Sequence, residues 1–472
     1  MTLDVAVINP PPPTPNCISK EGRCAGRGFL PLIHLTPLSL LYPAAVIEAQ
    51  GHTVSVHDGI AYGPIPADAI DADLVLVNVS PASYTMDMEF VRAVKEQRKD
   101  TLVAALGTLA TTRPDRILAD GADIVLRGEI ESTVAEVTQR LVSGKKLVGV
   151  PGLSLRSGNR IVHGADAVRP DLDALPYPAR HLIERDKYRF LFTGDISTSV
   201  LTGRGCPNQC TFCPSRIVNG TRTRDRYPRS IVEEIRYVHE SDGTSHFILY
   251  SDTFNASRRF VLDLCDELVR ENMGIEWACN SRADGLDDDI LGRMSRAGCR
   301  HITIGAESGS DAILERACKG ETTAVVKEAV EACSRAGIDA CMYFILGLPG
   351  ETRETVQETI DFAASLSTDY VMFSTATPYI GTPFAKEVGF DNDDLDVPRD
   401  EVNAIVDSDV IGITPQEIED AVKESYIRFY VRPNTLANHA SRIVRRPKMF
   451  GSTVTTAAGM ARYVLGMDVY DE

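Results

Sequence analysis

Three cysteines gather in one short segment of the chain, Cys206, Cys210 and Cys213, within the run GRGCPNQCTFCPS. Their spacing is C-x3-C-x2-C, and an aromatic residue, Phe212, precedes the last cysteine. Thiolates are the ligands of iron–sulfur clusters, and a cluster normally takes four of them. A loop that offers three thiolates therefore predicts a cluster with one iron left open for another ligand.

The alternatives for this loop are a zinc knuckle and a set of buried structural cysteines. Zinc would need a fourth Cys or His at similarly short range, and the next cysteine along the chain is the distant Cys265. Most of the remaining cysteines lie in apolar patterns typical of small buried side chains. These are Cys265, Cys299, Cys318, Cys333 and Cys341, with Cys279 near a strand end that faces the proposed site. Cys17 and Cys24 lie in a loop-like stretch and could form a second redox or metal pair.

The cysteine motif with its aromatic residue resembles the signature of radical S-adenosylmethionine (SAM) enzymes. The resemblance implies a 4Fe-4S cluster on Cys206, Cys210 and Cys213, whose open iron binds the amino and carboxylate groups of SAM. It also implies that one-electron reduction cleaves SAM to a 5′-deoxyadenosyl radical. The backbone near Phe212 is then expected to contact the adenine of SAM.

A repeating strand–helix pattern must position this loop. Six strand-like runs alternate with helix-like segments, at 197–202, 246–250, 275–280, 301–306, 340–346 and 370–376. This pattern predicts a partial (β/α)6 barrel, and we assign the radical SAM domain to residues 191–394. In such barrels the reactive groups lie at the carboxyl ends of the strands. The cysteine loop follows the first strand, and the turn GLPGET, with Thr352 as a helix cap, follows the fifth.

Polar residues follow three of the other strands at the same rim. By the resemblance, Ser251 and Asp252 fall where relatives bind the amino group of SAM. Ser281, Arg282 and Glu307 are further expected SAM contacts, with the arginine suited to a carboxylate. Ion pairs with each other or with neighbours are the alternative for Arg282 and Glu307, and a plain turn role is the alternative for Asp252.

The first third of the chain predicts a different α/β layer. Near-continuous apolar runs alternate with helix-like segments, which indicates a parallel sheet covered on both faces. The runs are at 3–8, 53–57, 74–79, 102–106 and 123–126. Thr36 is the expected cap of the first helix. No G-x-G-x-x-G follows the first strand, so a dinucleotide-binding fold is disfavoured.

Residues 1–145 resemble the Rossmann-like cobalamin-binding domains that precede some radical SAM domains. The resemblance rests on the NPPP start, the polar turn after the third strand and the GE-x-x-x-T sequence near the last strand. It implies cobalamin as a cofactor. The expected contacts are Ser80, Ser83, Gly107, Thr108, Gly128 and Glu129. A D-x-H-x-x-G motif is absent, so that motif supplies no histidine to the lower face of the corrin.

The linker and the tail complete the predicted organisation. Residues 146–190 read as an ordered linker with a hairpin around 157–159. Residues 395–472 read as a C-terminal helical domain, in which Thr414 starts a capping box. Its first helix carries Ile418, Val422, Tyr426 and Phe429 on one face. A basic cluster of Arg442, Arg445, Arg446 and Lys448 is either a solvated helix end or a contact for an acidic substrate or a membrane surface.

Composition limits the partners. The 472 residues have a formal net charge of −17, which disfavours nucleic acid because phosphate binding requires a basic face. The sequence shows no signal peptide and no transmembrane segment, so we expect a cytoplasmic protein with reduced thiols.

Together these patterns predict a cobalamin-dependent radical SAM enzyme. The expected reaction is methyl transfer to an unactivated carbon, or to phosphorus, of a small molecule, lipid or natural-product intermediate. The expected electron donor is a flavodoxin or a ferredoxin. A cobalamin-binding radical SAM cyclase is the first alternative, and a non-catalytic metal or cobalamin sensor is the second.

Overall fold

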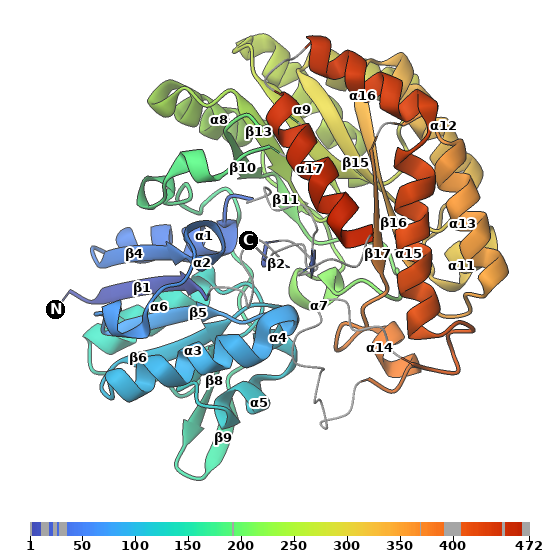
Figure 1. Ribbon diagram of the computed structural model, residues 1–472. Coiled ribbons are helices and arrows are strands. Elements are labelled where there is room, and N and C mark those ends of the chain that lie inside the picture. Colours follow the sequence, from blue (N-terminus) through green and yellow to red (C-terminus); the bar gives the residue numbers. More distant parts are fainter. Residues whose placement is uncertain are drawn as a thin grey trace.

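The computed structural model describes residues 2–10, 18–21, 26–27, 35–190, 193–368, 370–390, 407–445 and 449–464. Two α/β layers lie next to each other, and a group of C-terminal helices covers part of the second (Figure 1). The predictions for Cys17, Cys24 and the side chains of the basic cluster in the tail lie outside the described residues.

The first layer is built on a seven-stranded sheet with the order β4-β1-β5-β6-β7-β8-β9. The strands are β1 (Asp4–Asn9), β4 (Thr53–Asp58), β5 (Leu74–Asn78), β6 (Leu102–Leu106), β7 (Ile124–Leu126), β8 (Leu153–Ser157) and β9 (Arg160–His163). The first five are parallel, and β8 and β9 form an antiparallel hairpin at the edge. The five predicted strands and the predicted hairpin are confirmed, and the hairpin extends the first sheet.

Helices cover both faces of this sheet, as the apolar strands predict. They are α1 (Leu38–Glu48), α2 (Gly59–Tyr62), α3 (Tyr84–Gln97), α4 (Thr108–Thr112), α5 (Pro114–Ala119) and α6 (Glu131–Val142). Alternate residues of β1 enter two separate cores. Val5 and Val7 pack in the core that holds α1 and α6, whereas Ala6 and Ile8 pack in the core that holds α3. The carboxyl ends of the parallel strands are thereby fixed at one edge of the layer.

The expected cap of α1 is wrong. The capping position is Pro37, and no side chain caps the helix there. The hydroxyl of Thr36 instead accepts a hydrogen bond of 3.2 Å from the backbone amide of Ser199, in the first strand of the second layer. Thr36 therefore links the two layers.

The second layer is a six-stranded parallel sheet in chain order, β10-β13-β14-β15-β16-β17. The strands are β10 (Ser197–Leu201), β13 (His246–Tyr250), β14 (Glu276–Ser281), β15 (Cys299–Glu307), β16 (Asp339–Leu346) and β17 (Tyr370–Thr375). The main helices are α8 (Pro228–Asp242), α9 (Arg258–Glu271), α10 (Asp288–Arg296), α11 (Asp311–Arg316), α12 (Thr323–Arg335) and α13 (Arg353–Ser365). This arrangement confirms the predicted partial (β/α)6 barrel.

Short strands and helices lie between the main elements of the two layers. They are β2 (Ile18–Ser19), β3 (Gly26–Arg27), β11 (Gly203–Arg204), β12 (Arg224–Asp225), α7 (Ser215–Val218) and α14 (Pro383–Glu387). The strand β11 pairs antiparallel with β12 directly before the cysteine loop. This small ribbon lies near the centre of Figure 1, between the two large sheets.

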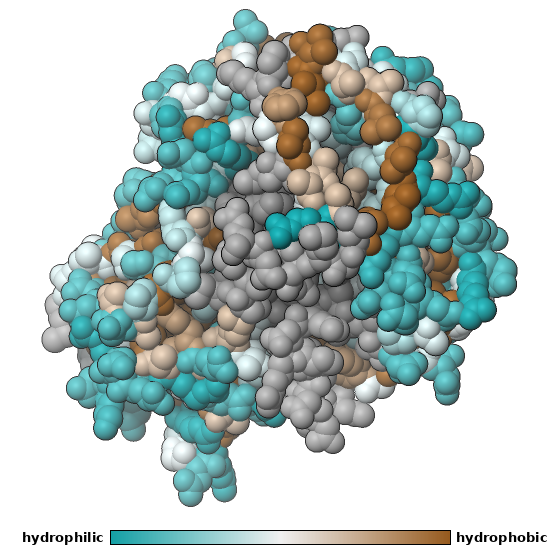
Figure 2. Space-filling model, in the orientation of Figure 1, coloured by the Kyte–Doolittle hydropathy of each residue, from teal (hydrophilic) through white to brown (hydrophobic). Residues whose placement is uncertain are grey.

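The C-terminal helices are α15 (Pro415–Tyr430), α16 (Pro433–Arg445) and α17 (Met449–Val464). The predicted apolar face of α15, namely Ile418, Val422, Tyr426 and Phe429, is buried. This helix lies along β17 (Figure 1), and Tyr426 and Tyr430 hydrogen-bond to the backbone of that strand. Figure 2 shows apolar residues gathered over the C-terminal helices, where Val444 and Phe450 are exposed. Within the described ranges, no helix has the length and apolar character to cross a membrane.

Candidate functional site

The cysteine loop lies at the carboxyl end of β10, at the rim of the barrel. Cys206 is buried, Cys210 and Cys213 are partly buried, and none of the three forms a disulfide. The backbone amide of Thr211 donates a 3.0 Å hydrogen bond to the carbonyl of Ala317. The loop is thereby attached to the turn that follows α11, on the opposite part of the rim.

Asp252 ties the two ends of the cysteine loop together. Its carboxylate accepts hydrogen bonds from the Gly205 amide at 2.6 Å, the Ser215 hydroxyl at 2.6 Å and the Asn219 amide group at 2.9 Å. These contacts favour the turn role over direct SAM binding for Asp252. The neighbouring Ser251 hydroxyl is buried and has no hydrogen-bond partner in the described part of the chain, so it can still accept a ligand.

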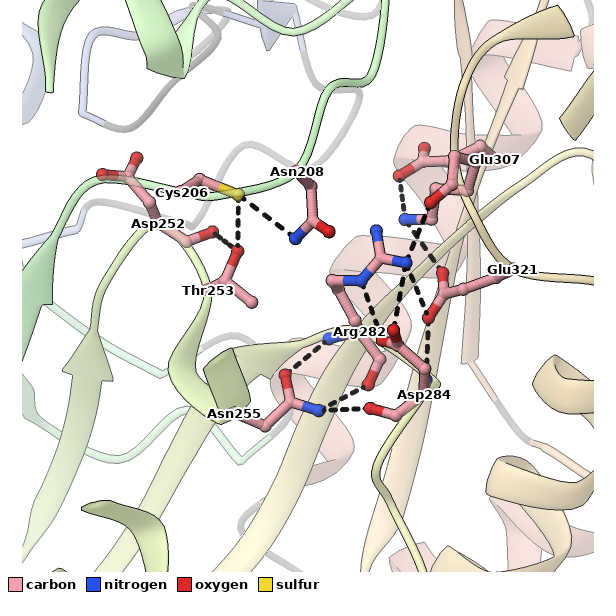
Figure 3. Close-up of polar contacts among 10 residues, drawn as sticks. Cys206, Asn208, Asp252, Thr253, Asn255, Arg282, Asp284, Glu307 and Glu321 are labelled. Carbon is pink, nitrogen blue, oxygen red and sulfur yellow. Dashed lines mark hydrogen bonds and ion pairs between the residues drawn. The ribbon is translucent and has the colours of Figure 1, made fainter. Parts of the chain in front are cut away.

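Polar groups also surround the first thiol (Figure 3). The Cys206 sulfur lies 3.1 Å from the Thr253 hydroxyl and 3.4 Å from the amide nitrogen of Asn208. Burial raises the pKa of the Cys210 thiol to about 11, and the ammonium of Lys319 opposes that rise. Hydrogen-bond donors and a cation beside thiolates suit an iron–sulfur cluster, whose negative charge they offset.

The spacing of the thiols also bears on the zinc alternative. No three His, Cys, Asp or Glu side chains among the described residues form a group that could hold a single metal ion. The thiolates of a cubane cluster each bind a different iron, so they need not converge on one point. Three thiolates on one loop are the donor set that a cluster with one open iron requires.

The guanidinium of Arg282 is paired with neighbouring groups of the protein. Its guanidinium donates to the carboxylate of Asp284 at 2.8 and 3.3 Å and to the carbonyl of Lys319 at 2.8 Å. Glu321 lies 3.6 Å away. The adjacent Ser281 is buried, with its hydroxyl 3.7 Å from the Cys279 sulfur. The ion-pair alternative for Arg282 is thus present, and only a further donor of this guanidinium could reach SAM.

Glu307 belongs to the same charged group (Figure 3). Its carboxylate pairs with the Lys319 ammonium at 3.1 Å, and Glu321 pairs with that ammonium at 3.3 Å. Burial alone would lower the pKa of Lys319, but the two carboxylates hold that pKa above its usual value. Glu307 also adopts a φ of +65°, a strained conformation for a residue other than glycine.

The sequence reasoning missed Asp284, Lys319 and Glu321. The signal available was a charged run, KGET at 319–322, between two helices. Charged residues in such turns usually face solvent. The structure buries Lys319 and Glu321 at the rim instead.

A pocket opens between the carboxyl ends of the two sheets. Five of the six expected cobalamin contacts line it, namely Ser80, Gly107, Thr108, Gly128 and Glu129. The barrel contributes Arg204, Asn219, Tyr250 and Asp252 to its wall. Because residues from both layers line the pocket, a ligand in it contacts the cysteine-loop side and the first domain together.

Two of the expected cobalamin contacts are part of a buried internal network. The Ser83 hydroxyl, which does not line the pocket, donates to Asp87 at 2.8 Å and lies 2.9 Å from the Ser80 hydroxyl. Asp87 pairs with the ammonium of Lys20 at 2.5 Å, and both side chains are fully buried. This network fixes the turn after β5, so these two serines support the pocket wall through their protein contacts.

The backbone conformation at Gly107 and the atoms packed against it require glycine. Its φ is +110°, and a Cβ atom here would lie 2.6 Å from both the Asn78 side-chain oxygen and the Val79 carbonyl. Any side chain would therefore push the turn after β6 away from the turn after β5.

Glu129 lines the pocket, but its carboxylate is paired with arginines. It pairs with Arg204 at 2.9 Å, with Arg224, and with Arg169 at 3.7 Å. The nearby Glu131, which the sequence reasoning missed, pairs with Arg204 through Oε1 at 2.5 Å. Its Oε2 is buried and has no hydrogen-bond partner within the described ranges. Burial alone would raise the pKa of Glu131, but Arg204 lowers it below its ordinary value.

The chemistry of the pocket lining suits the edge of a corrin. The periphery of cobalamin carries amide groups, and an ionised carboxylate oxygen without a partner is a strong acceptor for an amide N–H. The Glu131 carboxylate is therefore compatible with cobalamin.

Comparisons with known proteins agree with this geometry. Residues 34–138 match the B12 binding domain, and residues 200–363 match the Radical SAM superfamily. An uncharacterised methyltransferase of Pyrococcus horikoshii is 29% identical, over 92% of this chain and 95% of its own length. The anaerobic magnesium-protoporphyrin IX monomethyl ester cyclase of Rubrivivax gelatinosus is 24% identical, over 84% of this chain and 74% of its own length.

A solved structure shares the fold. The cobalamin-dependent SAM radical enzyme OxsB superposes with a TM-score of 0.70 and 15% identity, over 98% of this chain and 72% of the other. The order of the two matched domains agrees with that of the two layers described above. Residues 34–138 thus match a B12 binding domain and residues 200–363 a radical SAM domain, and the chain is a cobalamin-dependent radical SAM enzyme whose cofactors are a 4Fe-4S cluster, SAM and cobalamin.

Proposed function

We propose that this enzyme transfers a methyl group to an unactivated carbon, or to phosphorus, of a small molecule, lipid or natural-product intermediate. The observation that carries the proposal is the pocket lined by both layers, because a methyl carrier in the first domain and a radical generator in the second must reach one substrate. The Pyrococcus relative, which aligns along nearly its whole length, is named a methyltransferase and supports this reaction class.

The residues of the chain take distinct parts in this proposal. Cys206, Cys210 and Cys213 hold the cluster, and Asp252 fixes their loop through three hydrogen bonds. When bound, the cofactors supply one-electron cleavage of SAM and a carrier for the methyl group.

SAM binds at the rim beside the cysteine loop. Phe212 packs against the barrel core, and its backbone faces the adenine. Ser251 offers its hydroxyl, which has no hydrogen-bond partner among the described residues, and Glu307, which also pairs with Lys319, offers a carboxylate to the amino group. Ser281 and Arg282 complete this side, with the guanidinium held in place by Asp284.

The reaction consumes reducing equivalents, so the enzyme requires a low-potential electron donor such as a flavodoxin or a ferredoxin. The described cysteines form no disulfides, which suits the reducing conditions of the cytoplasm, where we place the protein.

A second candidate is a radical cyclase that uses the same cofactors without methylation. The Rubrivivax relative, which aligns with 84% of this chain, favours it. The two reactions differ in the products that SAM leaves behind. Methyl transfer yields S-adenosylhomocysteine together with 5′-deoxyadenosine, whereas cyclisation yields 5′-deoxyadenosine alone.

The test is an anaerobic reconstitution of the full chain with iron, sulfide and hydroxocobalamin. The reconstituted protein receives a strong reductant, SAM with a labelled methyl group and fractions of a cell extract as the substrate source. We expect 5′-deoxyadenosine, S-adenosylhomocysteine and a labelled product in mass spectra, and none of the three with Cys213→Ala. Formation of 5′-deoxyadenosine without S-adenosylhomocysteine or label would favour the cyclase. Absence of SAM cleavage in cluster-loaded protein would contradict both candidates.

A further inference from the structure

Arg204 joins the two domains directly before the cluster loop. It lies on β11, two positions ahead of Cys206. Its guanidinium bonds to Glu129 at 2.9 Å and to Glu131 at 2.5 Å. Glu129 lies in the turn between β7 and α6 of the B12-binding domain, and Glu131 is the first residue of α6; both are more than seventy positions earlier in the chain. Both terminal nitrogens of one guanidinium therefore bind carboxylates of the B12-binding domain.

These ion pairs are shielded from water. The side chains of Arg204, Glu129 and Glu131 expose 14%, 1% and 4% of their surface. Arg224, which pairs with Arg204 across β11 and β12, also binds Glu129. Buried ion pairs contribute little net stability because desolvation is costly, and their best-attested role is to fix one arrangement. We therefore interpret this cluster as a positioning device.

The segment between Arg204 and the first cysteine is held firmly. The Gly205 amide donates to Asp252 at 2.6 Å, and the Cys206 amide donates to the Gly220 carbonyl at 3.2 Å. Gly205 has a φ of +91°, and a Cβ atom there would lie 2.1 Å from the Arg222 carbonyl. A shift of Arg204 is therefore passed on to Cys206, since the residue between them has little room to absorb it.

The two carboxylate oxygens of Glu131 have different surroundings. Its Oε1 binds Arg204, while its Oε2 is buried and without a partner in the part of the chain that is described, and the residue lines the pocket between the domains. The carboxylate is a hydrogen-bond acceptor only, so a ligand that satisfies Oε2 must bring a donor. The amide groups at the rim of a corrin supply such donors.

We propose that Glu131 binds a peripheral amide of cobalamin, and that the Glu131–Arg204 pair couples cobalamin binding to the geometry of the cluster loop. Glu131 and Arg204 are thus positioning residues for the cluster. The proposal rests on the assignment of the B12-binding domain and holds for methyl transfer and for cyclisation alike. By thermodynamic linkage the coupling is reciprocal, so a cluster in the loop must tighten cobalamin binding by the same factor by which cobalamin favours the cluster-ready loop.

The experiment measures hydroxocobalamin affinity by absorbance titration, in full-length protein with and without a reconstituted cluster. For the wild type we expect tighter binding in the cluster-loaded form by a factor of about 5 to 150. Glu131→Gln should weaken binding to the loaded form by about tenfold or more and bring the ratio of the two affinities close to one. Arg204→Lys keeps the positive charge but lacks the forked guanidinium. Its affinity ratio should lie between that of the wild type and that of Glu131→Gln.

A spectroscopic readout separates positioning from general damage. Cobalamin should change the electron paramagnetic resonance spectrum of the reduced cluster in the wild type and leave it unchanged in Glu131→Gln. Glu417→Gln is the matched control, because Glu417 pairs with Arg353 on the barrel surface away from the pocket. It should behave as the wild type in both assays.

Three results would overturn the coupling. They are an equal cobalamin affinity with and without the cluster in the wild type, a normal affinity ratio in Glu131→Gln, and a loss of coupling in Glu417→Gln. If Glu131→Gln does not fold by circular dichroism, Arg204→Lys decides alone, and a wild-type ratio there rejects the proposal. A wild type that binds no cobalamin in either form rejects the B12 assignment as well, which distinguishes that failure from a failure of the coupling.

Discussion

The carboxylates at the rim of the barrel perform different tasks. Asp252 accepts three hydrogen bonds from the cysteine loop and its flanks, so its charge is used to fix the loop. Glu307 holds a buried lysine, Lys319, against the rim. A ligand that binds here meets an electrostatic arrangement already in place, and the protein need not reorganise during the reaction.

Asp252→Asn tests the support of the loop. The substitution places an amide donor among three donors, so at least one hydrogen bond is lost and the loop loosens. We expect less iron per chain after reconstitution and SAM cleavage slower by about 10- to 100-fold. Iron counting and 5′-deoxyadenosine formation measure the two effects. Asp263→Asn on the exposed side of α9 is the control, and equal losses in both variants would contradict the role.

Glu351→Gln tests a buried carboxyl in the GLPGET turn. Burial raises the pKa of Glu351 from 4.5 to about 8. Among the residues that the structure describes, one carboxyl oxygen accepts from the amides of Gly347 and Leu348, and the other has no hydrogen-bond partner. The folded state binds the proton more tightly than the unfolded chain. The stability from the neutral carboxyl is therefore complete below pH 4.5 and is lost as the pH rises toward about 8.

Glutamine keeps the shape and cannot ionise, so we expect the variant to unfold at a temperature that changes less across this pH window. Thermal unfolding followed by circular dichroism on both sides of the window measures the difference. A variant whose unfolding temperature falls as steeply as that of the wild type would show that Glu351 stays ionised in the fold.

At the scale of elements, α15 protects the outer edge of the barrel sheet. The Tyr426 hydroxyl accepts from the Phe373 amide at 2.8 Å and donates to the Phe373 carbonyl at 2.9 Å. Tyr430 makes the same pair of bonds with Val371. An exposed strand edge pairs readily with other chains, and two tyrosines here satisfy backbone groups that would otherwise be free.

Tyr426→Phe should therefore destabilise the protein by about 1–3 kcal/mol, because it leaves a buried amide and carbonyl of β17 unpaired. It should also raise the tendency to aggregate. Urea unfolding and light scattering measure the two effects. Tyr227→Phe, at a side chain that is 71% exposed, should match the wild type. Wild-type stability in Tyr426→Phe would mean that water or a shifted helix replaces the tyrosine.

At the scale of the molecule, the two layers are joined by several buried polar contacts. Thr36 accepts from Ser199, and Arg180 bonds to the Ser199 carbonyl at 2.7 Å and to Glu234 at 2.6 Å. Together with the Arg204 cluster, these contacts make the placement of the pocket a property of both layers. The domain boundaries at 145, 190 and 394 remain predictions.

Cobalamin should therefore stabilise the whole molecule. A ligand present at about 100 times its Kd adds about 2.7 kcal/mol to the unfolding free energy of whatever unfolds as one unit with its site. We expect hydroxocobalamin to raise the unfolding temperature of both layers in scanning calorimetry. If only part of the transition moved, the layers would unfold independently, and the contacts between them would be too weak to connect them.

The sequence by itself determined the elements and the chemistry of the cysteine loop. Short strand-like runs, most of them rich in apolar residues, marked the eleven predicted strands, because parallel strands buried on both faces are largely apolar. Thr352 and Thr414 marked helix starts, and both form capping boxes in the structure. These features depend on local spacing, which can be read without knowing what lies opposite.

The tertiary structure alone decided which charges meet. Arg204 binds Glu129 and Glu131 across more than seventy positions, and Lys319 meets Glu307 only when the turn after α11 folds back onto the end of β15. The partner of a charged side chain depends on the geometry that buries it. A carboxylate that is exposed to water and a carboxylate that pairs with an arginine are the same letter in the sequence, so the sequence does not distinguish them. For that reason Glu129 could be placed in the pocket from the sequence, whereas its arginines could not.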